Sequence, residues 1–167
     1  YAANGLGGQV EILGLNPRSA QGDRCIVPYH MQLCGPGEAE LDVSQCPDLV
    51  PPLAAHAALR QGITRIVNAA RLRIKESDRL ATTRQLLEDP GADVEKIPDG
   101  LVVRGRTALR GGACDGTRDH RIVMSAAVAG ARTCTPVVIR GAQAVRKSYP
   151  DFFDDFARLG GLVFQED

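Results

Sequence analysis

Two short clusters of charged residues have the composition to bind and act on an anion. The segment from Arg71 to Arg79 places four cations and two acids within nine residues. Lys75 and Arg79 stand on either side of Ser77, which we interpret as the N-cap of a helix, so both cations can reach an anion held at that helix start. Backbone N–H groups and the helix dipole favour negative charge there. The alternative interpretation is a solvated basic loop.

The second cluster, Asp119-His120-Arg121, stands at the start of another expected helix. Asp48 precedes a third helix, and Lys147 precedes a fourth. An acid ahead of a helix can be only its cap, and a single lysine is ordinarily a surface residue. Gathered around one axis, however, these helix starts would form an anion-binding face. The face would carry Asp48, Lys75, Glu76, Arg79, Asp119, His120, Arg121 and Lys147.

The elements that would position these residues alternate between strands and helices. The hydrophobic pattern predicts strands over 8–13, 64–67, 136–140 and 162–165. It predicts helices over 49–60, 78–88, 119–131 and 149–159, the second capped by Ser77 and the last by Ser148. Pro98-Asp99-Gly100, between 92–97 and 101–104, predicts a β-hairpin. This alternation indicates an α/β fold, α and β mixed, with helices packed against mixed sheets.

The sequence also repeats itself, without a gap, when position 48 is laid on position 119. The pairs that then coincide are Asp48 and Asp119, Val67 and Val138, Glu76 and Lys147, and Ser77 and Ser148. All four pairs occupy matching places in the expected elements, which favours duplication over chance. An earlier copy is expected at 9–13 and Ser19, but Ser19 lies closer to Ser77 than Ser77 lies to Ser148. The first unit is therefore predicted to be shortened, between positions 23 and 41.

Composition limits the class of protein. The 167 residues carry 20 Lys+Arg and 20 Asp+Glu, and this balance disfavours partners that need a basic surface, namely nucleic acids and membranes. No apolar run approaches the ~20 residues that span a bilayer, and no signal peptide is seen, so we expect a cytoplasmic protein. The length suits one domain over 1–167. Tyr1 in place of Met predicts a piece of a longer chain.

The cysteines and two of the three histidines receive no chemical role from their spacing. The five cysteines contain no Cys-x-x-Cys pair and lack the spacing of a structural zinc site, so reduced thiols and no metal site are expected. His30 and His56 lie outside the repeated positions, and His56 is expected to be a packed or surface histidine. Gly5, Gly7 and Gly8 match neither a dinucleotide fingerprint nor a P-loop.

Several strings resemble one family when they are read in order. They are GLNPRSAQGD, QCPDLVPPLAAHAAL, RIKESDRL, DHRIVMSAAVA and KSYPDFF, and they resemble the 5-enolpyruvylshikimate-3-phosphate synthase (3-phosphoshikimate 1-carboxyvinyltransferase) family. The resemblance covers nearly all of this chain but only the C-terminal portion of the family's length. It implies two domains, each of three β-α-β-α-β-β units, of which this chain would be the C-terminal domain without its N-terminal partner. The period that relates Ser77 to Ser148 agrees with such units.

The resemblance implies a transferase of the shikimate pathway, which leads to chorismate and the aromatic amino acids. Members move the enolpyruvyl group of phosphoenolpyruvate to the 5-hydroxyl of shikimate 3-phosphate and release phosphate, by addition followed by elimination. The expected partners are these two small molecules and the missing N-terminal domain, and no metal or organic cofactor is implied. Correct positioning of the substrates can supply ~7–11 kcal/mol of barrier lowering, and half of the positioning groups would be missing with the N-terminal domain. The isolated chain is therefore expected to fold without turnover.

The same motifs imply roles for two acids and for two residues near them. Asp48 corresponds to the acid that contacts the 5-hydroxyl and is a candidate general base. Glu76 corresponds to the carboxylate that handles the proton at C3 of phosphoenolpyruvate. Lys75 corresponds to a lysine near the shikimate moiety, and His120 to a neighbour within the site. A positioned acid or base is typically worth about 10²–10⁴-fold in rate, so the loss of either acid should be severe.

The remaining motif residues are implied to bind phosphoenolpyruvate. Arg79 and Arg121 correspond to arginines that clamp it, because a bidentate guanidinium suits carboxylate and phosphate groups. Lys147 corresponds to a lysine that closes on its phosphate. Asp119 is expected to cap its helix and to orient Arg121.

Three other interpretations stay open on the sequence alone. UDP-N-acetylglucosamine enolpyruvyl transferases share the fold and the donor, although the strings KESDR and DHR favour the shikimate enzyme. A non-catalytic domain could keep the repeat and bind an anion or a protein partner through the charged face. An RNA-processing enzyme of similar repeat architecture would need a basic surface, which the zero net charge disfavours.

Overall fold

The computed structural model describes residues 11–74, 78–116 and 118–166. The expected catalytic residue Glu76, the expected substrate ligand Lys75 and the expected cap Ser77 lie outside the described residues, as do residues 8–10 of the first expected strand. None of the helices within the described ranges is long and apolar enough to cross a membrane.

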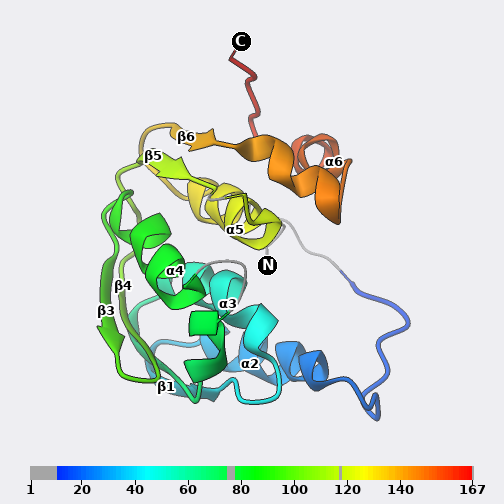
Figure 1. Cartoon of the computed structure of the whole chain (residues 1–167), viewed down its shortest axis with the longest axis vertical. Helices are drawn as coiled ribbons and strands as arrows, with labels where there is room; N and C mark the ends of the chain where they lie inside the picture. Colours follow the sequence, from blue (N-terminus) through cyan, green and yellow to red (C-terminus); the bar gives the residue numbers. More distant parts are fainter. Residues whose placement is uncertain (1–10, 75–77, 117, 167) are drawn as a thin grey trace.

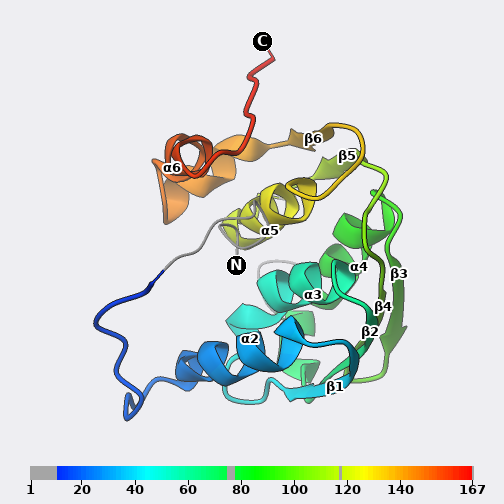
Figure 2. The ribbon, with the colours of Figure 1, turned by 180° about the vertical axis from the view of Figure 1, so that it is seen from behind.

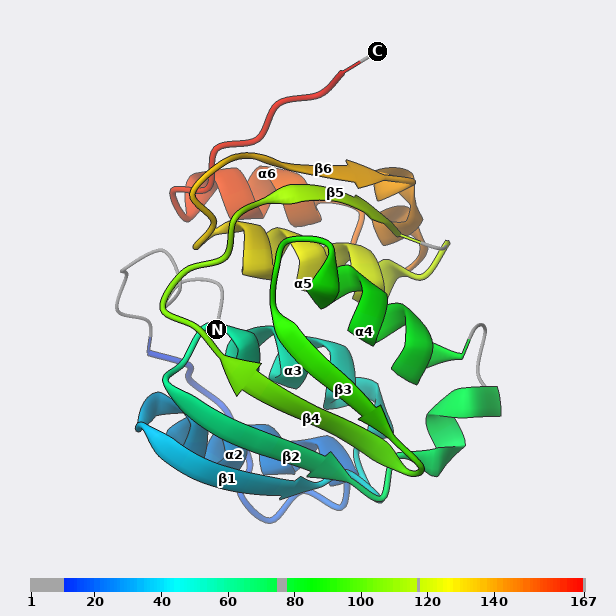
Figure 3. The ribbon, with the colours of Figure 1, turned by 90° about the vertical axis from the view of Figure 1, so that its left-hand side faces the viewer.

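The first complete unit has the β-α-β-α-β-β order that the resemblance implies. It consists of β1 (Gly37–Asp42), α3 (Val50–Ala58), β2 (Gly62–Val67), α4 (Arg79–Glu88), β3 (Asp93–Ile97) and β4 (Gly100–Gly105). The sheet order is β1-β2-β4-β3, in which β1 and β2 are parallel and the other pairs are antiparallel. The helices of the unit cover one face of this sheet (Figure 3). The predicted hairpin and the helices over 49–60 and 78–88 are thereby confirmed.

A second unit repeats the first four elements of this order. It consists of β5 (Gly112–Asp115), α5 (His120–Gly130), β6 (Val137–Arg140) and α6 (Phe152–Arg158), with β5 and β6 parallel. Figure 1 shows α5 between this small sheet and the helices of the first unit. The chain is therefore a mixed α/β protein built on a repeated unit, as the sequence predicts.

The two units are not related by one gapless offset, however. At the ends of the parallel strands the Val43 N–H donates to the carbonyl of Val67, and the Gly116 N–H donates to that of Arg140. Val67 and Arg140 are the last residues of β2 and β6, and a residue with positive φ follows each of them, so Val67 corresponds to Arg140 and not to Val138, with which the gapless alignment pairs it. The connection between the first strand and the helix start is two residues shorter in the second unit, which is why Asp48 and Asp119 still align.

A helical segment that the sequence analysis missed precedes the first unit. It consists of the 3₁₀ helix η1 (Gly22–Cys25) and α2 (Ile26–Cys34), followed directly by β1. Three further 3₁₀ helices are η2 (Pro47–Leu49), η3 (Ala70–Ile74) and η4 (Ala142–Lys147). No side-chain cap marks the start of α2, so the usual capping signal for a helix start is absent there.

Two Ala-rich helices form the centre of the core. Seven of the nine residues of α3 are buried, and seven of the eleven residues of α5 are buried. The two helices pack against each other, which small side chains permit at close range. Burying a large aliphatic side chain such as Leu53 or Ile122, both 0% exposed, contributes about 1.5–3 kcal/mol. This core fixes where the starts of α3 and α5 lie.

Two stretches predicted as strand and two predicted helix starts differ from the structure. Residues 11–13 and 162–165 form no strand, because neither stretch has a neighbouring strand within the described ranges to share backbone hydrogen bonds. The cap of α4 is Asp78, whose carboxylate accepts from the Ala81 N–H at 3.1 Å. The last helix begins at Phe152 rather than at 149, so Ser148 ends η4 instead of capping α6. Pro150 explains the delay, since a residue before proline disfavours helical backbone.

Candidate active site

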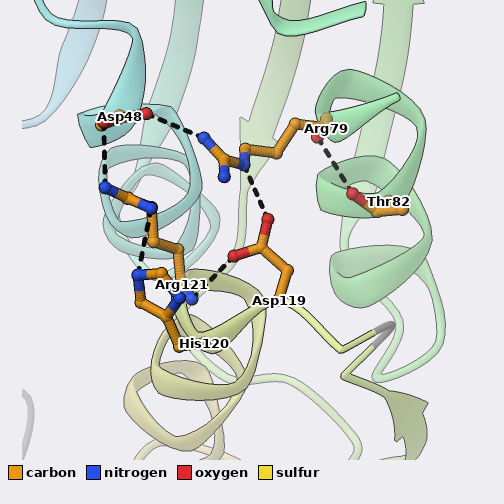
Figure 4. A network of polar contacts seen from close by, with 6 residues as sticks. All are labelled: Asp48, Arg79, Thr82, Asp119, His120 and Arg121. Atoms are coloured by element: carbon orange, nitrogen blue, oxygen red, sulfur yellow. Dashed lines mark hydrogen bonds and ion pairs between the residues drawn. The ribbon is translucent and has the colours of Figure 1, made fainter. Parts of the chain in front are cut away.

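Three helix starts converge on one network of ion pairs. Asp48 lies in η2 immediately before α3, Arg79 is the first residue of α4, and Asp119 is the N-cap of α5. Figure 4 shows their side chains pointing toward one another, together with His120 and Arg121 from the first turn of α5. The sequence analysis proposed all five residues for one charged face, and the structure brings them together.

Asp48 accepts hydrogen bonds from two guanidinium groups. Its Oδ1 atom lies 2.8 Å from Nη1 of Arg79, and its Oδ2 atom lies 2.9 Å from Nη2 of Arg121. Charge-assisted hydrogen bonds of this kind are roughly twice as strong as neutral ones. Since 34% of the Asp48 side chain remains exposed, the carboxylate is held in place and can still be approached from solvent.

Arg79 is the buried centre of the network. Its side chain is 2% exposed, and its Nε atom donates to Oδ2 of Asp119 at 2.7 Å. The Asp119 side chain is itself only 1% exposed. A buried guanidinium needs such partners, because losing one leaves a desolvated charge uncompensated. The Arg79 carbonyl also accepts from the Thr82 hydroxyl at 3.3 Å (Figure 4). Arg79 therefore joins the acids of the two repeat units and does not face solvent.

Asp119 caps α5 as the sequence analysis expects. Its Oδ1 atom accepts from the backbone N–H of Arg121 at 2.9 Å, while Oδ2 binds Arg79. The Arg121 guanidinium also lies 3.0 Å from Nε2 of His120, which is the acceptor because a guanidinium can only donate. Arg121 is 30% exposed, so it and Asp48 form the accessible side of the network.

The described charges of the network balance. Asp48 and Asp119 offset Arg79 and Arg121, so the four residues together carry no net charge. The sequence analysis expected an anion-binding face, and these four residues alone supply no surplus positive charge for it. An anion that binds here has to compete with Asp48 for Arg121 or draw on further cations.

Two further cations belong to elements that pack against these helices. Lys147, exposed, lies in the last turn of η4, and η4 packs against α5. Lys96, on β3, was missed by sequence reasoning, since nothing in a strand residue signals that its side chain reaches the start of α4. Its Nζ atom lies 2.7 Å from Oδ2 of Asp78. Burial alone would raise the pKa of Asp78, but the hydrogen bonds from Lys96 and the Ala81 N–H hold that pKa below its ordinary value.

Comparison with known proteins gives a consistent result. The family model described as EPSP synthase (3-phosphoshikimate 1-carboxyvinyltransferase) matches residues 19–156. Relatives named 3-phosphoshikimate 1-carboxyvinyltransferase include those of Clostridium novyi, 41% identical over 95% of this chain, and Clostridium kluyveri, 43% identical over 95%. A solved EPSP synthase structure from Acinetobacter baumannii is 35% identical and superposes with a TM-score of 0.67, covering 72% of this chain and 28% of that one.

The lengths of these proteins differ from that of the chain in two ways. The chain spans about 40% of the length of the curated relatives it matches. The Clostridium perfringens relative is 39% identical over an alignment of 185 residues, which is longer than the 167 residues of this chain. The relative therefore carries residues within the aligned region that this chain lacks. With its fold, its family match and its relatives in agreement, the chain belongs to the EPSP synthase (3-phosphoshikimate 1-carboxyvinyltransferase) family.

Proposed function

We propose that the protein to which this chain contributes transfers the enolpyruvyl group of phosphoenolpyruvate to the 5-hydroxyl of shikimate 3-phosphate and releases phosphate. The observation that carries the proposal is the Asp48–Arg79–Asp119–Arg121 network at three converging helix starts. The network joins an accessible carboxylate to an accessible guanidinium. Addition–elimination on an anionic substrate requires both groups. The names of the relatives favour this reaction over the UDP-N-acetylglucosamine one and over a non-catalytic domain.

The network suggests how substrate binding could free a base. Arg121 is accessible and shares one of its N–H groups with Oδ2 of Asp48. When the carboxylate or phosphate of phosphoenolpyruvate binds Arg121, it competes for that group, and Asp48 gains an oxygen able to accept the proton of the 5-hydroxyl. Asp48 remains positioned meanwhile by Arg79 at 2.8 Å. General base catalysis by such a carboxylate typically contributes about 10²–10⁴-fold.

Arg79 takes a different part in this proposal from the one that the resemblance implies. The resemblance makes it a clamp on phosphoenolpyruvate, whereas here its side chain is 2% exposed and bound to two carboxylates. We assign it to positioning Asp48 and Asp119 in the arrangement described. Direct contact with the substrate would require this buried guanidinium to become accessible.

The remaining roles rest on the resemblance. Glu76 would move the proton at C3, Lys75 would lie near the shikimate moiety, His120 would line the site, and Lys147 would bind the phosphate. Because the described charges of the network cancel, Lys75 and Lys147 would supply the surplus positive charge that a doubly or triply anionic substrate needs.

The chain would act as the C-terminal domain of a longer enzyme in the cytoplasm. We propose that its first repeat unit is shortened between residues 23 and 41, and that an N-terminal domain supplies most of the contacts with shikimate 3-phosphate. The 40% coverage of the relatives supports this division. The chain alone would then bind substrate poorly and would not turn over.

The test is a phosphate-release assay on three preparations. They are the chain alone, the chain joined to the N-terminal portion of the Clostridium novyi relative that it does not cover, and the joined protein with Asp48→Asn. With phosphoenolpyruvate and shikimate 3-phosphate, we expect release only from the joined proteins, and about 10²–10⁴-fold less from Asp48→Asn. Glu95→Gln, a change at an exposed ion pair on β3, is the matched control.

Two results would contradict the proposal. A joined protein that releases phosphate with UDP-N-acetylglucosamine as acceptor, and not with shikimate 3-phosphate, would reassign the substrate. Equal rates for Asp48→Asn and Glu95→Gln would remove Asp48 as the base. Steady release by the chain alone would refute only the requirement for an N-terminal domain.

A further inference from the structure

We propose that His30, Cys34 and His56 bind a divalent transition-metal ion of the zinc type. His30 and Cys34 are one helical turn apart on α2, and His56 lies on α3. Figure 2 shows α2 and α3 side by side, and the two helices are in contact. The packing of the two helices thus brings His56 beside a histidine–cysteine pair that lies far from it in the sequence.

The distances between the donor atoms suit a small metal ion. One donor atom from each of the three residues lies within 4.8 Å of the other two. The Sγ atom of Cys34 is 3.7 Å from Nε2 of His30. In a tetrahedral zinc site, with Zn–S near ~2.3 Å and Zn–N near ~2.1 Å, sulfur and nitrogen ligands are roughly 3.6 Å apart. Small rotamer adjustments therefore bring all three donors onto one ion.

The chemistry of the donors selects the class of metal. One thiolate and two imidazoles suit zinc and similar ions, whereas magnesium and calcium prefer oxygen ligands. Imidazole coordinates in its neutral form, which predominates near pH 7 because the ordinary pKa of histidine is about 6.5. The thiol proton of Cys34 would pass to solvent when the ion binds.

The surroundings leave room for the ion and a fourth ligand. The three residues line a surface hollow of about 400 Å³, and Cys34 is exposed. Arg60 and Arg132 line the same hollow. The Arg60 guanidinium is bound to the carbonyl of Gly35 at 2.6 Å and to the Thr64 hydroxyl at 3.0 Å, which holds its charge in place. Water would complete a four-coordinate site.

The site is separate from the ion-pair network. Asp48 precedes the start of α3 and His56 lies near its end, eight residues on, which corresponds to about 12 Å along the helix axis. A metal here would not touch the residues proposed to act on the substrate. It would tie α2 to α3 and so hold the segment that precedes the first repeat unit.

The test is a zinc titration of the metal-stripped chain against a chromophoric chelator. We expect one zinc per chain, with an affinity at least about tenfold lower in Cys34→Ser. Cys34 is exposed, so this variant should fold normally, and a thermal melt without metal verifies it. Cys134→Ser, which removes another exposed thiol, and Cys25→Ser are the matched controls and should bind as the parent does.

Cobalt provides a second measurement. Co²⁺ in the parent chain should show the intense visible bands of tetrahedral coordination and a thiolate charge-transfer band, and Cys34→Ser should lose the latter. His56→Gln should lower the zinc affinity at least about tenfold as well. The proposal is overturned if the parent chain binds no zinc at micromolar concentrations, if Cys34→Ser binds as tightly as the parent, or if a control variant abolishes binding.

Discussion

Replacing Asp119 by asparagine tests whether the buried ion pair at the centre of the network holds the two repeat units together. The amide oxygen can still cap α5 by accepting from the Arg121 N–H, because asparagine is as good an N-cap as aspartate. What is lost is the carboxylate that receives Nε of Arg79 at 2.7 Å, with both side chains at most 2% exposed. The substitution therefore isolates the ion pair from the cap.

The expected cost follows from burial. Breaking a buried ion pair costs about 3–5 kcal/mol, and because Arg79 keeps its bond to Asp48 we expect about 3 kcal/mol. Asp119→Ala removes the cap as well and should cost about 1 kcal/mol more. Urea unfolding of the three chains at pH 7, with linear extrapolation to water, measures both differences.

A surface ion pair provides the control. Glu95 and Arg104 lie 2.9 Å apart but are 57% and 45% exposed, so Glu95→Gln should cost less than about 1 kcal/mol. If Asp119→Asn costs no more than Glu95→Gln, the ion pair contributes nothing to joining the repeat units. If Asp119→Ala and Asp119→Asn cost the same, the capping contribution is absent.

Three further predictions concern packing, pH and binding. Gly105→Ala would push its Cβ into the carbonyl of Arg60, so urea unfolding should show a loss of about 1–3 kcal/mol, whereas Gly35→Ala, with open space at its Cβ, should show little change. Since the pKa of Asp78 is lowered in the folded state, its contribution to stability is present above the ordinary pKa and is lost as the pH falls through the pKa of the folded state. Asp78→Asn should therefore make the acid-induced fall in the free energy of unfolding shallower. Arg121→Ala should weaken phosphoenolpyruvate binding to the joined protein by roughly 10–150-fold in calorimetry, from the loss of charged hydrogen bonds of about 1.5–3 kcal/mol; unchanged binding would exclude Arg121 as a ligand.

The parts of the fold that were predictable carry strong local signals. The helix at α3 is marked by Pro51 and Pro52 at its start and by a run of alanines and leucines, and α5 is marked by its cap Asp119. The β3–β4 hairpin is marked by Pro98-Asp99-Gly100. Where a cap or a turn fixes the backbone locally, the sequence and the tertiary structure agree.

The parts that were not predictable depend on distant neighbours. In β1 only Ala39 and Leu41 are buried, among charged residues, and the strand exists because β2 offers it a parallel edge. Conversely, residues 162–165 have a strand-like composition and form none. Pairing between strands is a tertiary property, so the apolar pattern of either stretch cannot decide it.

The candidate site shows the same division. Its charged members were identified from their places ahead of helices, but which acid binds which arginine was not. Burial of Arg79 between acids from two units follows from how α3, α4 and α5 pack, and the reach of Lys96 to Asp78 follows from how β3 lies beside α4. The trio of His30, Cys34 and His56 was missed because α2 itself was missed.

The shared use of Asp48 constrains how this protein can evolve. One carboxylate receives hydrogen bonds from Arg79 in its own repeat unit and from Arg121 in the next. A substitution at position 48 therefore changes the surroundings of both arginines at once, and the effects of changes at these three positions should not be additive. Within the family, we expect tolerated substitutions in this network to arise as correlated sets rather than one at a time.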